Sequence, residues 1–138
     1  MQLWILGENS WARGFESLLL RKSLKTLYFT YSILMKFYTY LLYSKSNDRF
    51  YIGQSENLVE RLGKHNGGLV KSTKPYLPWE LVWYDIYDTR SESMSREKKL
   101  KNLKSQRRVI DYISKNGRIN PKSSSEFLIK IRESTKND

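Results

Sequence analysis

Two short segments of aromatic and branched residues, separated by turn-forming residues, constrain the fold of this chain most. Residues 37–43 read FYTYLLY, and residues 49–53 read RFYIG. Side chains of these types favour β-strands. Between the segments lie Ser46, Asn47 and Asp48, which are typical of turns. The pattern therefore predicts a β-hairpin with a loop of moderate length.

The residues that follow the hairpin predict a helix and a third strand. Ser55 is the predicted N-cap of a helix that runs to about Asn66, where Gly67 and Gly68 end it. Residues 69–78 form a polar loop, and residues 79–87 predict the strand. Alternation along this strand would direct to one face the side chains of Trp79, Leu81, Trp83 and Asp85, and to the other those of Val82, Tyr84 and Ile86.

Two further helices are predicted after the third strand. Thr89 and Glu92 have the spacing of a capping box, so a helix should begin near Arg90 and end near Leu103. Ser105 is the predicted N-cap of the next helix, which Asn116 and Gly117 end. Its apolar residues share one face: Val109, Ile110 and Ile113. The predicted folded domain therefore spans residues 35–113.

The segments on either side of this domain have weaker patterns. Residues 1–34 show no steady period, and we expect an extension without regular structure that is not native to the protein. Residues 13–17 resemble the protein reading of a conserved transfer RNA arm, and Met35 precedes the first strand. We expect translation to start naturally at Met35. Residues 114–138 predict a polar, mobile tail with at most a short helix around 126–132.

The overall charge indicates a polyanionic partner. The chain of 138 residues has a formal net charge of +11, which attracts nucleic acid first and an anionic membrane surface second. Residues 24–43 are rich in apolar side chains, but Lys25 and Lys36 interrupt them, so we expect no membrane span. The chain has no cysteine, which excludes disulfides and thiolate metal sites and is compatible with the cytoplasm, our expected location.

The positive charge is concentrated between Arg96 and Arg108, where Glu97 is the only acidic residue. A solvated helix face and a nucleic-acid surface are both compatible with such a run, and its single sign favours the surface. The residues predicted to contact nucleic acid are Arg61, Lys64, Lys98, Lys101, Lys104, Arg107 and Arg108.

A small set of polar residues could perform chemistry. Tyr40 and Tyr51 lie on paired strands, and Arg61 and His65 share one helix face because they are four residues apart. A single histidine cannot form a histidine-rich zinc site. The chain also lacks a nucleophile elbow, a P-loop and a dinucleotide-binding glycine motif.

Glu97 lies on the helical line of Met94 and Leu100, so it interrupts an expected apolar stripe. A buried carboxylate is unfavourable unless it is paired, hydrogen-bonded or bound to a metal ion. Two interpretations follow: a salt bridge at the rim of the core, for example to Arg61, or a ligand for a divalent cation in a cleft.

Over residues 36–112 the ordered motifs resemble those of GIY-YIG nucleases, and most closely the small stand-alone bacterial members. The segment Tyr38–Thr39–Tyr40, a ten-residue gap and Tyr51–Ile52–Gly53 resemble the two-part signature. Further matches follow on the expected helices: Asn57, Leu58, Arg61, His65, Asn66, Arg96 and Glu97.

The resemblance implies a small α/β fold with a three-stranded antiparallel sheet flanked by helices. It implies an endonuclease that hydrolyses phosphodiester bonds with one divalent metal ion, Mg²⁺ or Mn²⁺, held by Glu97. Arg61 would contact the scissile phosphate. Tyr40 or Tyr51 would prepare the water, with His65 as a supporting catalytic residue. The substrate would be DNA, although RNA stays open.

Two departures from the family pattern bear on function. Tyr38 and Thr39 replace the glycine and isoleucine of the family's short name, a change that the small members tolerate. Gln54 stands where repair-associated members carry lysine, so no repair role follows. Two alternatives to an enzyme are an inert nucleic-acid-binding module and a peripheral membrane protein.

Overall fold

The computed structural model describes residues 10–136 of the chain. These residues belong to two compact units, the first ending at Met35 and the second beginning at Lys36. The elements of the second unit are β1 (Phe37–Ser44), η2 (Lys45–Asn47), β2 (Arg49–Ser55), α2 (Leu58–Asn66), η3 (Lys74–Tyr76), β3 (Glu80–Tyr87), α3 (Arg90–Asn102), α4 (Gln106–Lys115), β4 (Arg118–Ile119) and α5 (Ser125–Thr135).

The first unit contains one helix, α1 (Ser10–Leu34), where the sequence pattern predicted no regular structure. The segment holds several leucines and no proline, so local propensity favours a helix even without an apolar stripe. Its large apolar side chains from Leu18 to Leu34 are exposed. The part of the predicted extension at residues 1–9 lies outside the described residues, and the start at Met35 stays a prediction. Within residues 10–136, no helix is both long and apolar enough to cross a bilayer.

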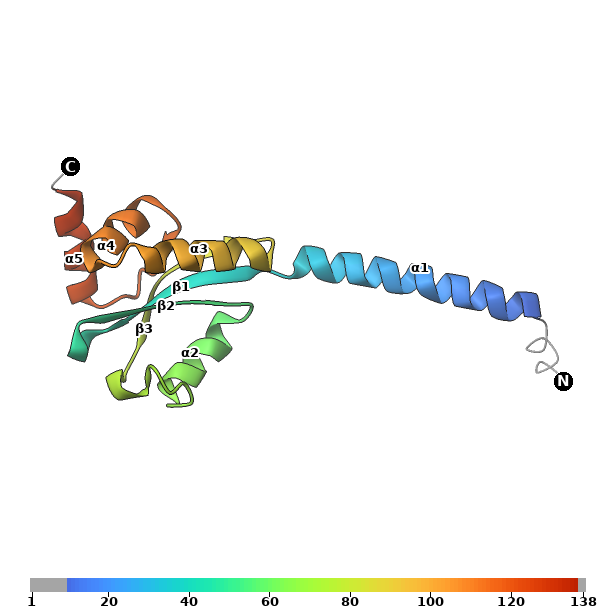
Figure 1. Cartoon of the computed structure of the whole chain (residues 1–138), viewed down its shortest axis with the longest axis horizontal. Coiled ribbons are helices and arrows are strands. Elements are labelled where there is room, and N and C mark those ends of the chain that lie inside the picture. The colour runs from blue at the N-terminus through green and yellow to red at the C-terminus, as the bar shows by residue number, and fades with distance from the viewer. Residues whose placement is uncertain (1–9, 137–138) are drawn as a thin grey trace. The chain divides into compact units, whose positions relative to one another are not determined.

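The second unit is built on an antiparallel sheet with the strand order β2-β1-β3-β4 (Figure 1). The three predicted strands and their hairpin are confirmed, with Tyr40 opposite Gly53 and Tyr84. The prediction that the sheet has only three strands is wrong, because a fourth strand, β4, pairs with β3 through Ile119 and Trp83. A two-residue strand is too short to show the alternation by which strands are recognised in a sequence.

Helices cover both faces of the sheet. The helix α2 lies on one face, and α3, α4 and α5 gather on the other (Figure 1). The core on the α3 side includes Leu41, Val82, Trp83, Leu100 and Phe127. The core on the α2 side is built from aromatic residues around Tyr40, Leu42 and Trp79. The α/β class predicted from the sequence is therefore correct.

A register shift between Leu41 and Leu42 breaks the expected alternation of β3. Leu41 faces Trp83, but Leu42 faces Leu81, so Val82 is the additional residue of a bulge. Leu81 consequently packs on the α2 side, whereas Val82 and Trp83 both lie in the core on the α3 side. The prediction that Leu81 and Trp83 share a face is wrong for this reason.

The helix starts agree in part with the sequence pattern. The capping box of Thr89 and Glu92 is present at α3. The N-cap of α2 is Asn57 and not Ser55, because the Asn57 side chain accepts a hydrogen bond from Glu60 N, and Ser55 Oγ accepts one from Asn57 N. The predicted apolar face of α4 is confirmed, since Val109, Ile110 and Ile113 are buried.

The C-terminal segment is part of the fold, and the predicted mobile tail is wrong. Phe127 of α5 is fully buried and packs against Tyr43 and Phe50. Lys130 pairs with Asp48, and Ser124 Oγ donates to Glu80 Oε1. The polar composition of residues 114–138 hides this packing, because one aromatic residue anchors the whole segment.

Candidate functional site

The paired strands β1 and β2 bring Tyr40 and Tyr51 to the face of the sheet that α2 covers. Their ring centroids are 6.4 Å apart. Gly53, opposite Tyr40, permits this arrangement, since a Cβ atom at residue 53 would lie 2.5 Å from Tyr40 Oη. The glycine of the second motif is therefore required by the ring of the first.

The helix α2 adds Arg61 and His65 to the two tyrosines. Leu58 and Leu62 pack against the aromatic cluster and set the face of α2 that meets the sheet. Arg61 Nε donates to Tyr40 Oη at 3.3 Å, and Tyr40 Oη lies 3.1 Å from His65 Nε2. The structure thus brings together four of the predicted site residues.

Thr73 continues this chain of hydrogen bonds beyond His65. Its Oγ1 lies 2.8 Å from His65 Nδ1 and donates to Val70 O at 3.3 Å. A threonine hydroxyl has a single proton, so we assign the ring proton of His65 to Nδ1. His65 Nε2 is then an acceptor, and Tyr40 donates to it. The hydrogen bonds therefore run in one direction from Arg61 to Thr73.

Both central groups of this chain are neutral near neutral pH. Burial, together with the positive charge of Arg61, lowers the pKa of His65 to about 4. Burial raises the pKa of Tyr40 to about 12, although the hydrogen bond from Arg61 opposes this change. His65 is 0% exposed and Tyr40 2% exposed, so both act inside the protein and not at its surface.

The buried, neutral His65 predicts a loss of stability in mild acid. His65 is the only histidine, and as the pH falls below 6.5 the unfolded chain takes up a proton that the folded protein takes up only near pH 4. The free energy of unfolding should therefore fall by about 3 kcal/mol between pH 6.5 and pH 4. Urea titrations at successive pH values measure this slope.

The control for this prediction is His65→Gln, which removes the titrating ring. Its free energy of unfolding should be nearly independent of pH from about 6.5 to 5, above the range in which carboxylates titrate. An equal slope in both proteins would show that His65 is not the titrating group.

The contact with Thr73 predicts a second stability effect. Thr73→Val keeps the shape of the side chain but leaves the Nδ1 proton of His65 without its acceptor. The free energy of unfolding should fall by about 1–3 kcal/mol. Thr73→Ser retains the hydroxyl and should recover most of this loss, while Thr135→Val changes an exposed threonine of α5 as the matched control. Equal stability of the valine and serine variants would contradict the hydrogen bond from His65 Nδ1 to the hydroxyl of Thr73.

Glu97 reaches the site from α3 and makes no direct contact with the tyrosines. Its side chain is 20% exposed, and Oε1 accepts a hydrogen bond from Lys101 Nζ at 2.7 Å. The salt bridge suggested to Arg61 is therefore replaced by one to Lys101. Met94 is half exposed, so the expected apolar stripe is wrong at that residue; Ser93 and Leu100 are the buried side chains of α3. The charge of Glu97 is a minor cause of the raised pKa of Tyr40, after burial.

The donor set around Glu97 and Arg61 fits some metal ions and not others. Residues 10–136 contain no group of three or more histidine, aspartate or glutamate side chains that could hold a metal ion. A zinc site is therefore not supported, whereas Mg²⁺ commonly uses one or two carboxylates and completes its shell with water and substrate phosphate. Gln54 Oε1, a hard oxygen donor, is also buried without a hydrogen-bond partner in the described residues and lines a pocket with Arg61. Glu97, as a single carboxylate ligand, fits a magnesium-type ion.

The predicted nucleic-acid residues lie on α2 (Arg61 and Lys64), on α3 (Lys98 and Lys101) and from the end of α3 into α4. Lys64 pairs with Glu60, and Lys101 pairs with Glu97. Lys98 is exposed beside Glu97 in the same surface pocket. The remaining cations are exposed around the junction of α3 and α4, without a direct contact to the tyrosines: Lys104, Arg107 and Arg108.

Sequence reasoning missed Thr73 and the buried oxygen of Gln54. Thr73 lies in a loop, where no periodicity indicates which side chain turns inward. The only signal in the sequence for this contact was that Thr73, a polar residue, follows His65 by eight residues. Gln54 was noted only as a departure from the lysine of other family members.

Comparisons with known proteins agree with the motifs over the same region. A family model described as the GIY-YIG catalytic domain matches residues 36–109. A UPF0213 protein of Staphylococcus saprophyticus is 33% identical over 75 residues, which cover 54% of this chain and 90% of that protein. A UPF0213 protein of Streptococcus pyogenes is 32% identical over 80 residues, covering 57% and 86%.

Among solved structures, this chain is similar to the solution NMR structure of a UPF0213 protein from Bacillus halodurans. The two sequences are 30% identical, and the match covers 60% of this chain and 87% of the other, with a TM-score of 0.40.

Proposed function

The chain belongs to the GIY-YIG family of nucleases, and we propose that it is a metal-dependent endonuclease that hydrolyses DNA phosphodiester bonds. The observation that supports this most is the hydrogen-bonded chain from Arg61 through Tyr40 to His65, beside the half-buried Tyr51. This arrangement holds the half-buried cation of Arg61 on the buried hydroxyl of Tyr40.

Arg61 is suited to hold the scissile phosphate. Its Nε is bound to Tyr40, and no carboxylate in the described part of the chain pairs with it. The hydrogen bond to Tyr40 also raises the pKa of Arg61, so the group stays charged. The other guanidinium nitrogens can donate two parallel hydrogen bonds to phosphate oxygens.

The two tyrosines have different environments, which supports different roles. Tyr40 is almost completely buried, and its hydroxyl is occupied by Arg61 and His65. Tyr51 is only partly buried and packs edge-on against His65, with ring centroids 4.8 Å apart. We assign the contact with the attacking water to Tyr51, while Tyr40 and His65 position Arg61.

Glu97 would hold the divalent ion, Mg²⁺ or Mn²⁺. Such an ion polarises the phosphate and stabilises the departing oxygen when it is bound. Lys101 forms an ion pair with the Glu97 carboxylate. Arg61 supplies a second positive charge to the same phosphate. The net charge of +11 attracts the polyanionic substrate.

The test is cleavage of labelled duplex, single-stranded and branched DNA, with a matched RNA, in Mg²⁺ or Mn²⁺. We expect cutting of DNA that stops when EDTA removes the metal. Cutting of RNA alone would change the substrate class. Salt-dependent binding to DNA without any cutting would favour the inert nucleic-acid-binding module, and cutting that persists in EDTA would contradict the metal requirement.

A further inference from the structure

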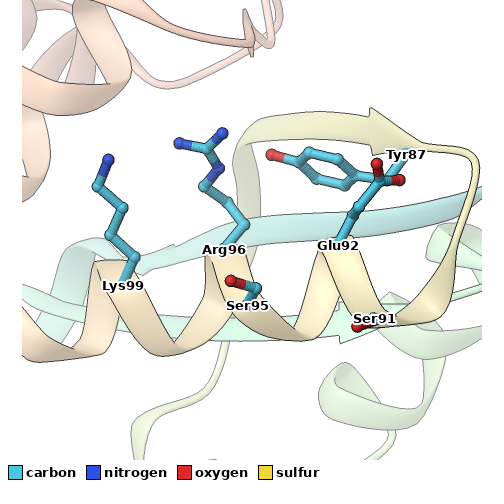
Figure 2. Close-up of a pocket in the computed structure, with 6 residues that line it drawn as sticks. All are labelled: Tyr87, Ser91, Glu92, Ser95, Arg96 and Lys99. Carbon is cyan, nitrogen blue, oxygen red and sulfur yellow. The ribbon is translucent and has the colours of Figure 1, made fainter.

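A cationic pocket separate from the site around Tyr40 and Arg61 lies on the side of α3 that faces Tyr87. It has a volume of about 540 Å³ and is lined by Tyr87, Ser91, Glu92, Ser95, Arg96 and Lys99. Figure 2 shows Arg96 and Lys99 projecting from the same side of α3, with the hydroxyl end of Tyr87 pointing toward Arg96. Arg96 and Lys99 have no role in the site around Tyr40 and Arg61.

Arg96 is held in this pocket by aromatic rings and not by a carboxylate. Its guanidinium lies 5.9 Å from the ring centroid of Tyr87 and 5.4 Å from that of Tyr112, and it donates to Tyr112 Oη. Lys99 Nζ lies 5.3 Å from the Tyr112 ring. Contacts with ring faces position both cations without neutralising their charge.

The acid that would ordinarily pair with Arg96 is engaged elsewhere. Glu92 precedes Arg96 by one helical turn, a spacing at which opposite charges usually pair. Its Oε2 instead accepts hydrogen bonds from Thr89 N and Thr89 Oγ1, as part of the capping box. Within residues 10–136, neither Arg96 nor Lys99 forms an ion pair with a carboxylate.

The pocket adjoins the surface depression that contains Glu97. The two share Ser91 and Ser95, so two small hydroxyl side chains lie where the pocket of Arg96 meets the depression of Glu97. A strand that passes Glu97 can cross α3 over these serines, beside Met94 and Lys98, which line the same depression.

We propose that the pocket of Arg96 and Lys99 binds a backbone phosphate of the nucleic acid, on the strand that runs from the Glu97 side across Ser91 and Ser95. This inference rests on the proposed nuclease function and adds a binding site for a phosphate away from the cleaved bond. Arg96 and Lys99, which have no acidic partner, lie next to the hydroxyls of Ser91 and Ser95. These groups match a phosphodiester, which carries one negative charge and exposed oxygens.

The test is the salt dependence of binding to a labelled DNA duplex in EDTA, where no metal-dependent cutting occurs. Arg96→Gln/Lys99→Gln should reduce the slope of log K against log salt by about 1, as expected for the loss of one neutralised phosphate. Lys122→Gln/Arg132→Gln removes the same charge from exposed residues of the second unit, beyond α4, and should leave the slope unchanged.

Each outcome separates this pocket from the proposed function. Wild-type protein that does not bind DNA would contradict both. Wild-type binding with equal slopes for the pocket and control variants would overturn the pocket alone. Because Arg96 packs on two rings, Lys99→Gln is the second variant should the double variant unfold; it should lower the slope in the same direction, by no more than about 1. Displacement of the duplex by a mononucleotide at equal phosphate concentration would overturn the assignment to a polymer backbone.

Discussion

Glu97→Ala should reduce metal-dependent DNA cleavage by about 1,000-fold while leaving DNA binding intact or slightly tighter. The carboxylate would hold the ion that stabilises charge on the phosphate and on the departing oxygen, a contribution of several kcal/mol to the barrier. Its removal frees Lys101 from the ion pair and raises the net charge of the metal-free protein, so electrostatic attraction to DNA measured in EDTA should not decrease. Single-turnover cleavage and equilibrium binding, measured on one substrate, separate the two effects.

Glu133→Ala is the matched control, because it removes an exposed carboxylate from α5 and changes the net charge equally. Its cleavage rate should stay within about twofold of the wild type. If Glu97→Ala cut DNA at the wild-type rate in Mg²⁺, Glu97 would not be the metal ligand. Equal losses of binding and cleavage would instead indicate damage to the fold.

Phe127→Ala should lower the free energy of unfolding by about 3–5 kcal/mol, as expected when a fully buried aromatic side chain is removed. Phe127 is 0% exposed and closes the core on the α3 side of the sheet, in contact with Tyr43 and Phe50. Urea denaturation followed by tryptophan fluorescence measures the change, because Trp83 lies in the same core.

Ile129→Ala provides the comparison, since Ile129 belongs to the same helix but is 48% exposed. It should change the free energy of unfolding by less than about 1 kcal/mol. If the two variants were equally stable, α5 would not be part of the cooperative unit, and the sequence-based prediction of a mobile tail would be restored.

The elements with strong local signals could be predicted from the sequence. The hairpin follows from two aromatic segments around a turn, and the start of α3 follows from the side chains of Thr89 and Glu92. The i, i+4 spacing of Arg61 and His65 correctly indicated one helix face, now seen in their contacts with Tyr40. In each case the interaction joins residues close in sequence, or residues of one regular element.

Other features depend on contacts between residues distant in sequence. The bulge at Val82 moves Leu81 to the opposite face of the sheet, and nothing in the unbroken apolar run from Leu81 to Tyr84 marks its place. The partner of Glu97 proved to be Lys101, because no periodicity distinguishes an acid that meets Arg61 from one that pairs along its own helix. Whether Glu97 also binds a metal ion stays a prediction.

The sequence by itself determined which elements form and which motif residues they carry, because strand alternation, helix periodicity and capping are local properties of the chain. Only the tertiary structure decided how those residues are oriented. Burial sets the protonation of Tyr40 and His65, Thr73 selects the tautomer of the histidine ring, and the capping box leaves Arg96 without an acidic partner. The physical reason is that burial and hydrogen-bond direction depend on how distant segments pack, which no local pattern records.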